Sequence, residues 1–310
     1  MNIVRLRGLK GLGGLGRVGG FRSLGSGPSN LQVEREKHTH NVAIVRPPPP
    51  NFAQGLVTHF PTPTGTDYGV ALEQWEGYCK VFKDHKGWEL KMLGEARVKG
   101  GSGTHCPDSV FVEDTAVLFK DDVVGEDVAV ICSNMAEIRR PEVGTMEEAI
   151  EGTGAFRVER IDGEGELLDG GDVLKVPGGN RVYVGLSSRS TPGGVERLQR
   201  VLPNHDIRGV PTTKVLHLKS CVTALPDGTI IGYDPIVDDT GFFDEGYLGL
   251  PEEGGAHVVV LDEKTLLMAA SAPKSAEILA KKGYNIEVAD ISQFEKLEGC
   301  VTCLSVRWRK

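Results

Sequence analysis

Seven short segments rich in β-branched or apolar residues follow one another from Ser109 onward, flanked by turn-forming residues such as Gly, Asp, Asn or Pro. Their sequences are SVFVEDTAVLF, DVAVIC, RVYVGL, KVLHL, TIIGY, HVVVL and TLLMAA. Segments of this length and composition predict β-strands. A further short strand is expected at Ala43 to Val45, before the four prolines Pro47 to Pro50, which exclude a helix and an interior strand.

Helices are expected between some of these strands. The clearest begins at Asp67, where apolar residues recur at i, i+3, i+7 and i+10: Leu72, Trp75, Cys79 and Phe82. Gly87 predicts its end. Shorter helices are expected at 145–150, 194–202 and 274–282. Thr145 and Glu148 fit a capping box at the start of the first of these. Strand pairs outnumber helices, so we predict an α/β domain in which a strand-strand-helix-strand unit recurs.

Two regions differ in composition. No long Ser/Gly linker interrupts residues 41–310, which we treat as one domain. Residues 1–40 form a Gly- and Leu-rich leader that is basic, with no acid before Glu34. Such a segment resembles a mitochondrial presequence, although its many glycines are equally typical of a disordered cytosolic tail. The six cysteines lack the dense spacing of a disulfide framework, so an intracellular location, cytoplasmic or mitochondrial, is expected.

The net charge of -8 opposes binding to nucleic acid, because a surface that follows phosphates needs excess Lys and Arg. A cationic small molecule suits this balance better. No apolar run reaches the roughly 20 residues that cross a bilayer, so no membrane segment is expected.

Three acids, Asp108, Glu113 and Asp114, lie within seven positions of a segment that otherwise predicts a strand. Their carboxylates are suited to bind a cation, and a guanidinium fits because its planar donors match carboxylate oxygens two at a time. Pairing with Lys or Arg inside the protein is an equally simple explanation. A zinc site is a further alternative, but His105 and Cys106 have no recognised zinc spacing.

The segment LDGGD holds Asp169 and Asp172 and is typical of a turn; it lacks the pattern of a phosphate loop. His217 lies between Leu216 and Leu218. A single histidine in an apolar strand is commonly a core residue, but a histidine with a cysteine and spare carboxylates is also the set that thiol catalysis requires.

The two cysteines of GCVTCLSVR, Cys300 and Cys303, allow several hypotheses. A structural zinc site would need a second ligand pair, and the chain has no other C-x-x-C and no H-x-x-x-H. A thioredoxin-like motif would open a helix, whereas only seven residues follow Cys303. Two hypotheses remain. Either one cysteine is a nucleophile and the other has no catalytic role, or both are buried residues of a C-terminal strand.

Taken in order, several segments resemble the dimethylarginine dimethylaminohydrolase family of the guanidine-modifying, or pentein, superfamily. They are AIVRPPPP, EGYC, PDSVFVEDTAV, RRPE, LLDGGDVL, VGLSSR, VLHLKS and GCVTCLSVR, and they extend over nearly all of residues 43–307. Each fragment alone is weak, but the ordered set is highly specific. The resemblance implies a single-domain, five-fold pseudosymmetric α/β propeller with one active site in its central channel.

The resemblance also implies a role for each matching position. Cys303 would be the nucleophile, His217 the general acid and base, and Asp169 the carboxylate that orients His217. The substrate-binding positions would be Asp108, Glu113 and Asp114 for the guanidinium, Arg139 and Arg189 for the amino-acid carboxylate, and Leu56 in a loop that closes over the substrate.

The implied reaction is hydrolysis of Nω,Nω-dimethyl-L-arginine, or the monomethyl compound, to L-citrulline and an amine through a covalent thiouronium on cysteine. It needs no metal and no organic cofactor. The expected partner is thus a small methylated arginine, not nucleic acid or membrane, and a homodimer is compatible with the sequence. An arginine deiminase-like or other guanidine hydrolase, and a non-catalytic guanidine-binding or thiol-sensing protein, are the alternatives.

Two departures from the family pattern bear on the choice of guanidine. Arg189-Ser190-Thr191 stands where the family usually has Arg-Thr-Asn, and His257 stands near a common Asn-Cys. His257 would either cap a strand end or reshape the mouth of the channel.

Overall fold

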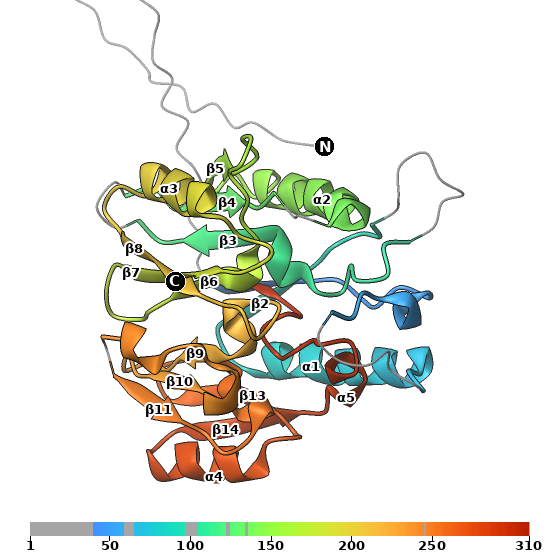
Figure 1. The fold of residues 1–310 in the computed structure, drawn as a ribbon. Helices are drawn as coiled ribbons and strands as arrows, with labels where there is room; N and C mark the ends of the chain where they lie inside the picture. Colours follow the sequence, from blue (N-terminus) through green and yellow to red (C-terminus); the bar gives the residue numbers. More distant parts are fainter. Residues whose placement is uncertain are drawn as a thin grey trace, which may run out of the picture. The chain divides into compact units, whose positions relative to one another are not determined.

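The computed structural model describes residues 40–58, 65–96, 105–121, 125–133, 136–244 and 246–309. All of them belong to one compact unit, Arg35–Lys310. The predicted leader lies outside the described residues, except for its last position. Figure 1 shows the described elements along the chain.

The described residues form five three-stranded sheets. In order across each sheet, they are β15-β1-β2 (Val306–Trp308, Asn41–Val45, Trp88–Met92), β3-β4-β5 (Ala116–Phe119, Val128–Ile131, Arg157–Arg160), β6-β7-β8 (Val173–Lys175, Arg181–Leu186, Asp206–Pro211), β9-β10-β11 (Val222–Ala224, Ile230–Gly232, Tyr247–Gly249) and β12-β13-β14 (Val258–Val260, Thr265–Ala269, Asn285–Ala289). The first strand of each sheet is called the inner strand, because all five of these strands line one cavity.

Every sheet has the same pairing. The inner strand is antiparallel to the middle strand, and the middle strand is parallel to the third. The parallel pair needs a crossover, which is made by α1 (Tyr68–Asp84), α2 (Arg140–Glu151), α3 (Pro192–Val201) and α4 (Pro273–Lys281). In the fourth unit two 3-10 turns, Asp234–Ile236 and Thr240–Phe242, replace the helix. The predicted strand-strand-helix-strand unit is confirmed in the second, third and fifth sheets; the first takes its inner strand from the C-terminus, and the fourth lacks the helix.

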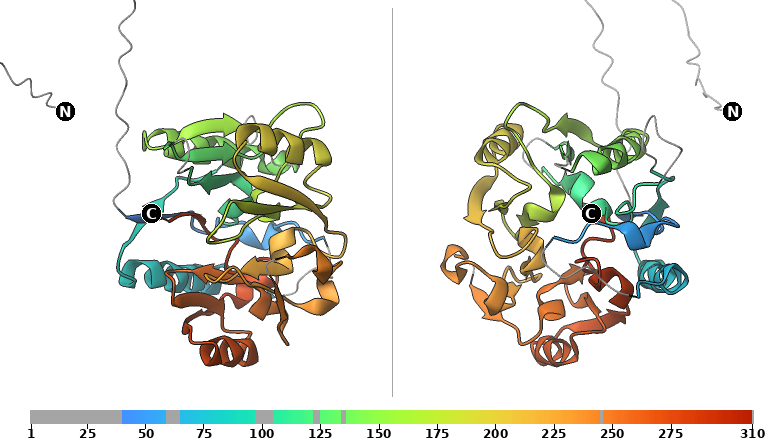
Figure 2. Two further views of the ribbon diagram at one scale, coloured as in Figure 1. Left: turned by 90° about the vertical axis from the view of Figure 1, so that its left-hand side faces the viewer. Right: turned by 45° about the vertical axis from the view of Figure 1, so that its right-hand side comes forward.

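The five units follow one another around a ring, as the right-hand view of Figure 2 shows. The C-terminal strand β15 closes it by pairing with β1, with Ala43 opposite Arg307. This closure brings the GCVTC segment, just before β15, back to the beginning of the fold.

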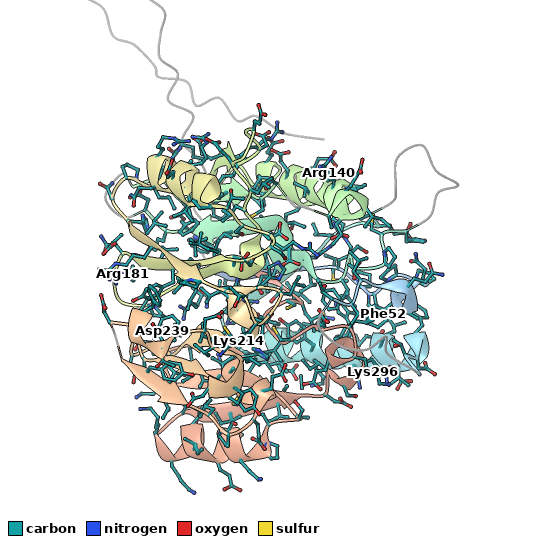
Figure 3. All side chains as sticks on the ribbon, viewed as in Figure 1. Phe52, Arg140, Arg181, Lys214, Asp239 and Lys296 are labelled. Carbon is teal, nitrogen blue, oxygen red and sulfur yellow. The ribbon has the colours of Figure 1, made fainter. Side chains whose placement is uncertain are left out.

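Cores lie between neighbouring sheets, so both faces of the middle strands are buried, whereas the third strands are partly exposed. Val42 and Ile44 of β1 pack in a cluster with Met146 of α2, whereas Ala43 and Val45 pack in the cluster of α1. Strands buried on both faces are apolar throughout, which explains the continuous apolar segments of the sequence. The helices turn their polar side chains outward, as α4 does in Figure 3; Glu277 is 75% exposed and Lys281 79%.

Helix positions were predicted well, but one helix start was wrong. Asp67, where the helix was predicted to begin, caps α1 by accepting a hydrogen bond from the Val70 amide at 3.0 Å. Helix α2 begins at Arg140, five residues before the predicted start, because Pro141 is accommodated in its first turn. Thr145 is therefore an interior residue whose hydroxyl donates to the Glu142 carbonyl at 2.9 Å, and the capping box does not form.

Two segments predicted as strands contain 3-10 turns instead. Val112–Thr115 is such a turn before β3, and His217 precedes another, Leu218–Ser220, before β9. Similar turns, Gly170–Asp172 and Glu253–Ala256, precede β6 and β12. The inner strands are only three or four residues long, so the polar residues before them are free to leave the strand pattern. Short α5 (Ser292–Glu295) was not predicted.

Candidate active site

A small cavity of about 30 Å³ lies beside the turns that precede the inner strands. Seven of the nine predicted site residues line it: Leu56, Asp108, Asp114, Arg139, Arg189, His217 and Cys303. Asp169 contacts His217 without lining the cavity. Glu113 does not line it either, but lines a larger neighbouring cavity, so its predicted place beside the substrate guanidinium stays a prediction.

His217 lies between two buried carboxylates. Its Nε2 is 3.2 Å from Asp169 Oδ2, and its Nδ1 is 3.7 Å from Asp114 Oδ1. Burial by itself lowers the pKa of His217, but the neighbouring carboxylates, Asp114 foremost, outweigh burial and raise the pKa to about 9. His217 is therefore an imidazolium at neutral pH, with both ring nitrogens carrying protons.

The LDGGD turn positions this histidine. A Cβ on Gly171 would lie 2.7 Å from the His217 ring and 2.6 Å from Asp114 Oδ1, so only glycine fits there. Asp172 accepts hydrogen bonds from the Leu218 amide at 2.9 Å and from the hydroxyls of Ser187 and Ser190 at 2.6 and 2.7 Å. No separate role was predicted for Asp172, although its place in the same turn as Asp169 was a usable signal.

Two buried carboxylates have oxygens without a hydrogen-bond partner among the described residues. Asp108 Oδ1 accepts from the Leu56 amide at 3.0 Å, but Oδ2 accepts nothing. Asp114 Oδ2 accepts from Arg139 Nη1 at 2.6 Å, but Oδ1 has no hydrogen bond. Burial raises the pKa of Asp108. Because buried acceptors are rarely left unsatisfied, these two oxygens mark a place for a donor in the cavity.

The two predicted carboxylate-binding arginines differ. Arg139 is engaged by both oxygens of Glu142, by Asp114 and by the Phe111 carbonyl. Arg189 Nη1 lies 3.6 Å from Asp169 Oδ2 and makes no hydrogen bond within the described part of the chain. Arg189 thus has donor capacity for a ligand in this structure, whereas a ligand would compete with Asp114 for Arg139.

Glu113 belongs to a separate polar cluster. It accepts from Lys219 Nζ at 2.7 Å, from Arg307 Nη2 at 2.9 Å and from the Thr302 hydroxyl at 2.9 Å. Two cations and a hydroxyl outweigh the cost of its burial, and the pKa of Glu113 is lowered. This ion cluster explains why a carboxylate can be fully buried here, and it fixes the turn next to Cys303.

The two cysteines lie at a turn, and the C-terminal strand considered for CLSVRW begins only at Val306. Their sulfurs are 3.1 Å apart, and Cys300 Sγ is also 3.2 Å from the Thr302 hydroxyl. The hydrogen bond from Cys303, opposed by burial and aided by nearby His257, lowers the pKa of Cys300 to about 6, and the same hydrogen bond raises the pKa of Cys303. The two thiols are therefore coupled, and a thiolate on either sulfur is stabilised by a hydrogen bond from the other.

Local backbone around this turn is tightly constrained. A Cβ on Gly299 would lie 2.3 Å from Phe111 Cε1. Glu298 adopts a φ of 59°, which is rare for a residue with a side chain and is found where surrounding contacts enforce it. Here the Glu298 side chain accepts from the Thr58 amide at 2.8 Å, joining the cysteine turn to the loop that carries Leu56.

The departures from the family pattern have structural explanations. Ser190 binds Asp172, as described above, and Thr191 caps α3 by accepting from the Gly194 amide at 3.2 Å. His257 Nε2 lies 2.8 Å from the Ser220 carbonyl, so that nitrogen must be the donor. His257 supports the turn after His217 and does not line the cavity.

Within the described ranges, no group of three or more His, Cys, Asp or Glu side chains is arranged to hold a metal ion. In the same part of the chain, no helix has the length and apolarity needed to span a bilayer.

A ring of five repeated α/β units with a cysteine, a histidine and carboxylates gathered at its centre defines the pentein class of guanidine-modifying proteins. No protein-family model matches the chain. A dimethylarginine dimethylaminohydrolase from Streptomyces coelicolor is 48% identical over 86% of this chain and 97% of its own length. The enzyme of the same name from Pseudomonas aeruginosa is 30% identical over 86% and 98%. The chain therefore belongs to the dimethylarginine dimethylaminohydrolase family.

Solved structures agree with this assignment. A dimethylarginine dimethylaminohydrolase in adduct with S-methyl-L-thiocitrulline has a TM-score of 0.72 and 28% identity, over 87% of this chain and all of its own. A mutant of the Pseudomonas aeruginosa enzyme complexed with citrulline has the same TM-score and identity, over 87% and 99%. The N-terminal domain of an arginine dihydrolase, ArgZ, is 17% identical with a TM-score of 0.67 and shows a shared fold.

Proposed function

We propose that this protein hydrolyses Nω,Nω-dimethyl-L-arginine and Nω-monomethyl-L-arginine to L-citrulline and di- or monomethylamine. The observation that carries the proposal is the pair of buried carboxylate oxygens, Asp108 Oδ2 and Asp114 Oδ1, that lack hydrogen bonds and line one cavity with Cys303 and His217. A guanidinium has the planar donors and the charge that this pair requires.

Binding precedes the chemistry. The cavity of about 30 Å³ has room for a water molecule but not for an arginine side chain, so its wall must open. Leu56 is the candidate for the closing residue, because its side chain is 42% exposed and its amide is bonded to Asp108. The substrate carboxylate would be bound by Arg189, and by Arg139 if it releases Asp114.

A guanidinium carbon is a weak electrophile, because resonance spreads its charge, so position and nucleophile strength decide the rate. The bound cation favours negative charge on Cys303, which loses its proton to water, and the Cys300 thiol 3.1 Å away stabilises the thiolate by a hydrogen bond. Cys303 Sγ then attacks the guanidinium carbon. The product is a neutral tetrahedral adduct with the dimethylamino group still attached.

His217 next donates a proton to the dimethylamino nitrogen, since an amide ion would be too basic to leave. The C–N bond breaks, dimethylamine departs, and a thiouronium cation remains on Cys303. Neutral His217 then takes a proton from a water molecule as the water oxygen attacks the same carbon. Collapse of this second adduct breaks the C–S bond, expels the Cys303 thiolate and releases the hydroxyl proton to water, which leaves the urea group of citrulline. Asp169 holds the His217 ring throughout.

A citrulline-release assay over a panel of guanidines tests the substrate assignment. The panel contains dimethylarginine, monomethylarginine, free arginine and agmatine, and the first two are expected to have the highest kcat/KM. Discrimination by methyl groups is worth on the order of 1–3 kcal/mol per methyl contact. Faster turnover of free arginine than of dimethylarginine would contradict the assignment and favour a deiminase.

Two further proposals concern the protein in its cell. An intracellular location, cytoplasmic or mitochondrial, is supported by six cysteines without disulfides among the described residues and by the basic leader. N-terminal sequencing of the native protein tests for cleavage of the leader.

We also propose that the protein forms a homodimer. Light scattering of the purified protein tests this proposal.

A further inference from the structure

A second, much larger cavity of about 780 Å³ is lined by all five inner strands. Neighbouring residues in the turns before these strands face different cavities. Glu113, Lys219 and Thr302 line the large cavity, whereas the next residues along the chain, Asp114, Ser220 and Cys303, line the small one. The turns thus separate the large cavity from the candidate active site.

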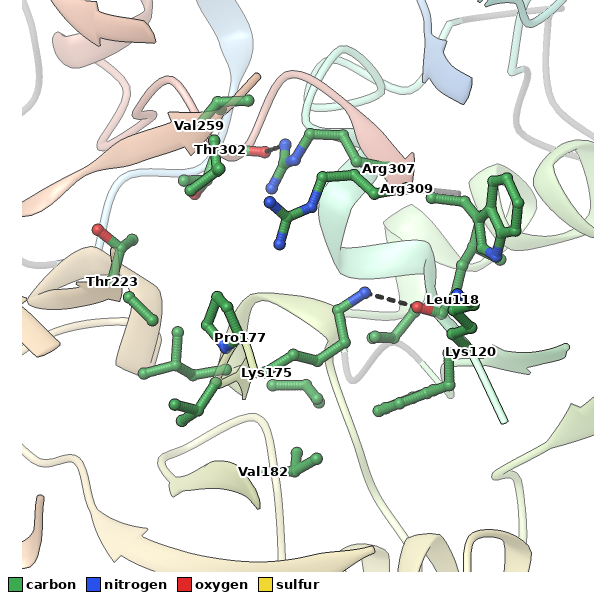
Figure 4. Close-up of a pocket in the computed structure, with 18 of the residues that line it drawn as sticks. Leu118, Lys120, Lys175, Pro177, Val182, Thr223, Val259, Thr302, Arg307 and Arg309 are labelled. Carbon is green, nitrogen blue, oxygen red and sulfur yellow. Dashed lines mark hydrogen bonds between the residues drawn. The ribbon is translucent and has the colours of Figure 1, made fainter. Parts of the chain in front are cut away.

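Basic side chains converge in the large cavity. Figure 4 shows Lys175 facing the guanidinium groups of Arg307 and Arg309. Lys219 joins them, because its ammonium and Arg307 both bind Glu113. The Lys175 ammonium donates to the Leu118 carbonyl and lies 5.5 Å from the Phe119 ring centre. Arg309 has no carboxylate partner among the described residues.

Few acids balance these cations. Glu113 is the carboxylate that contacts them, and it is already shared by Lys219 and Arg307. The two other acids of the lining, Asp262 and Glu263, come from the turn between β12 and β13, where Asp262 Oδ2 lies 2.9 Å from His85. The Lys175 side chain reaches solvent through the cavity. The surrounding protein atoms and the charges of Arg309, Lys219 and Arg307 lower its pKa.

We propose that the large cavity binds a multivalent oxyanion, specifically the phosphate group of a small molecule, through Lys175 and Arg309 with Lys219 and Arg307 behind them. An arginine fork and a lysine point charge are the groups that bind phosphate oxygens in proteins. The wall beside them includes Pro177, Val182 and Val259, which gives apolar surface for an organic portion of the ligand. The cavity is large enough for a compact metabolite.

Isothermal titration of the full chain with inorganic phosphate and with pyrophosphate, at constant ionic strength set by chloride, tests the proposal. The wild-type protein is expected to bind one anion per chain. The double variant Lys175→Gln, Arg309→Gln is expected to lose at least about tenfold in affinity, because two charged donors are removed. Lys281→Gln, which removes an exposed lysine of α4, is the matched control and should bind as wild type.

Neither Lys175 nor Arg309 lines the candidate active site, so turnover of dimethylarginine by the double variant should be unchanged and demonstrates that it is folded. Absence of saturable binding by wild-type protein up to about 10 mM of either anion, well above the roughly millimolar affinities of weak ligands, would overturn the proposal. Equal affinity in the wild-type protein and the double variant would also overturn it, because the anion would then be bound elsewhere.

Discussion

At the scale of single residues, the site depends on how adjacent side chains divide their contacts. Glu113 is saturated by two cations and a hydroxyl, whereas Asp114 and Asp108 each keep one oxygen without a hydrogen bond. The charge on Glu113 stabilises the fold, whereas the charges on Asp114 and Asp108 are available to a substrate. The sequence put all three in one group, because their contacts come from segments far along the chain.

The buried charge of Asp108 is expected to lower the stability of the fold and to serve substrate binding. Asp108→Asn removes a buried charge whose pKa is already raised by burial, so the free energy of unfolding should stay equal or rise. The same change should lower kcat/KM for dimethylarginine by roughly 10- to 100-fold, because a charged acceptor for the guanidinium is lost. Denaturant unfolding and steady-state kinetics measure the two effects.

Glu277→Gln, at an exposed position of α4, is the control and should change neither quantity. An Asp108→Asn variant with wild-type kcat/KM would remove Asp108 from the site. A markedly lower free energy of unfolding for Asp108→Asn would show that the Asp108 charge is compensated within the folded protein.

His217 should make stability depend on pH in a predictable direction. Its pKa is raised from 6.5 to about 9, so the folded protein binds the proton more tightly than the unfolded chain. This stabilisation is complete below pH 6.5, declines as pH rises, and is lost above pH 9, with a total of about 3 kcal/mol. Unfolding of wild-type and His217→Gln proteins at several pH values measures it. The difference between them should shrink from pH 6 to pH 9.5, and a constant difference would contradict the pKa shift.

At the scale of elements, the short turns before the inner strands carry the site. The middle strand of each sheet and three of the four long helices could be predicted, because burial on both faces and helical periodicity are local signals. The third strand of every sheet was not predicted, because it is only partly buried and lacks a continuous apolar pattern. The turns at Val112–Thr115 and Leu218–Ser220 could not be predicted, because their apolar residues continue the strand pattern. Only packing around the ring makes the chain turn at these positions. The contact of Gly171 with His217 joins residues 46 positions apart and had no local signal either.

Gly171→Ala tests how closely the LDGGD turn positions the histidine. The added Cβ would lie 2.7 Å from the His217 ring, so the ring must move. A displacement of this kind should lower kcat/KM by about 100-fold. Gly179→Ala is the matched control, since its nearest neighbour would be 3.9 Å away, and it should retain activity. Equal activities of the two variants would show that the close approach at Gly171 is unimportant.

At the scale of the whole molecule, closure of the ring by β15 brings Cys303 to residues that precede it by almost the length of the domain. Trp308 of β15 is 4% exposed, and its ring centre lies 6.2 Å from that of Phe156 in the second unit. Closure therefore adds Trp308 to the buried side chains that join the first and second units. The closed ring was predicted from the family resemblance. Composition and periodicity predicted only the repeated unit.

Trp308→Ala is expected to lower the free energy of unfolding by roughly 3–5 kcal/mol, the usual cost of removing a large buried aromatic ring. Chemical unfolding followed by circular dichroism measures it. Phe242→Ala, at a side chain that is 39% exposed, should cost far less. Similar losses in the two variants would mean that closure by β15 adds little stability.

The central claim, that Cys303 is the nucleophile of a guanidine hydrolase, is tested most directly by trapping. Enzyme mixed with dimethylarginine is quenched in acid, digested, and examined by mass spectrometry for an adduct that has lost dimethylamine. The adduct should be on the peptide of Cys303, should persist in Cys300→Ser, and should vanish together with turnover in Cys303→Ser. An adduct on Cys300, or a Cys303→Ser variant that still releases citrulline, would contradict the account.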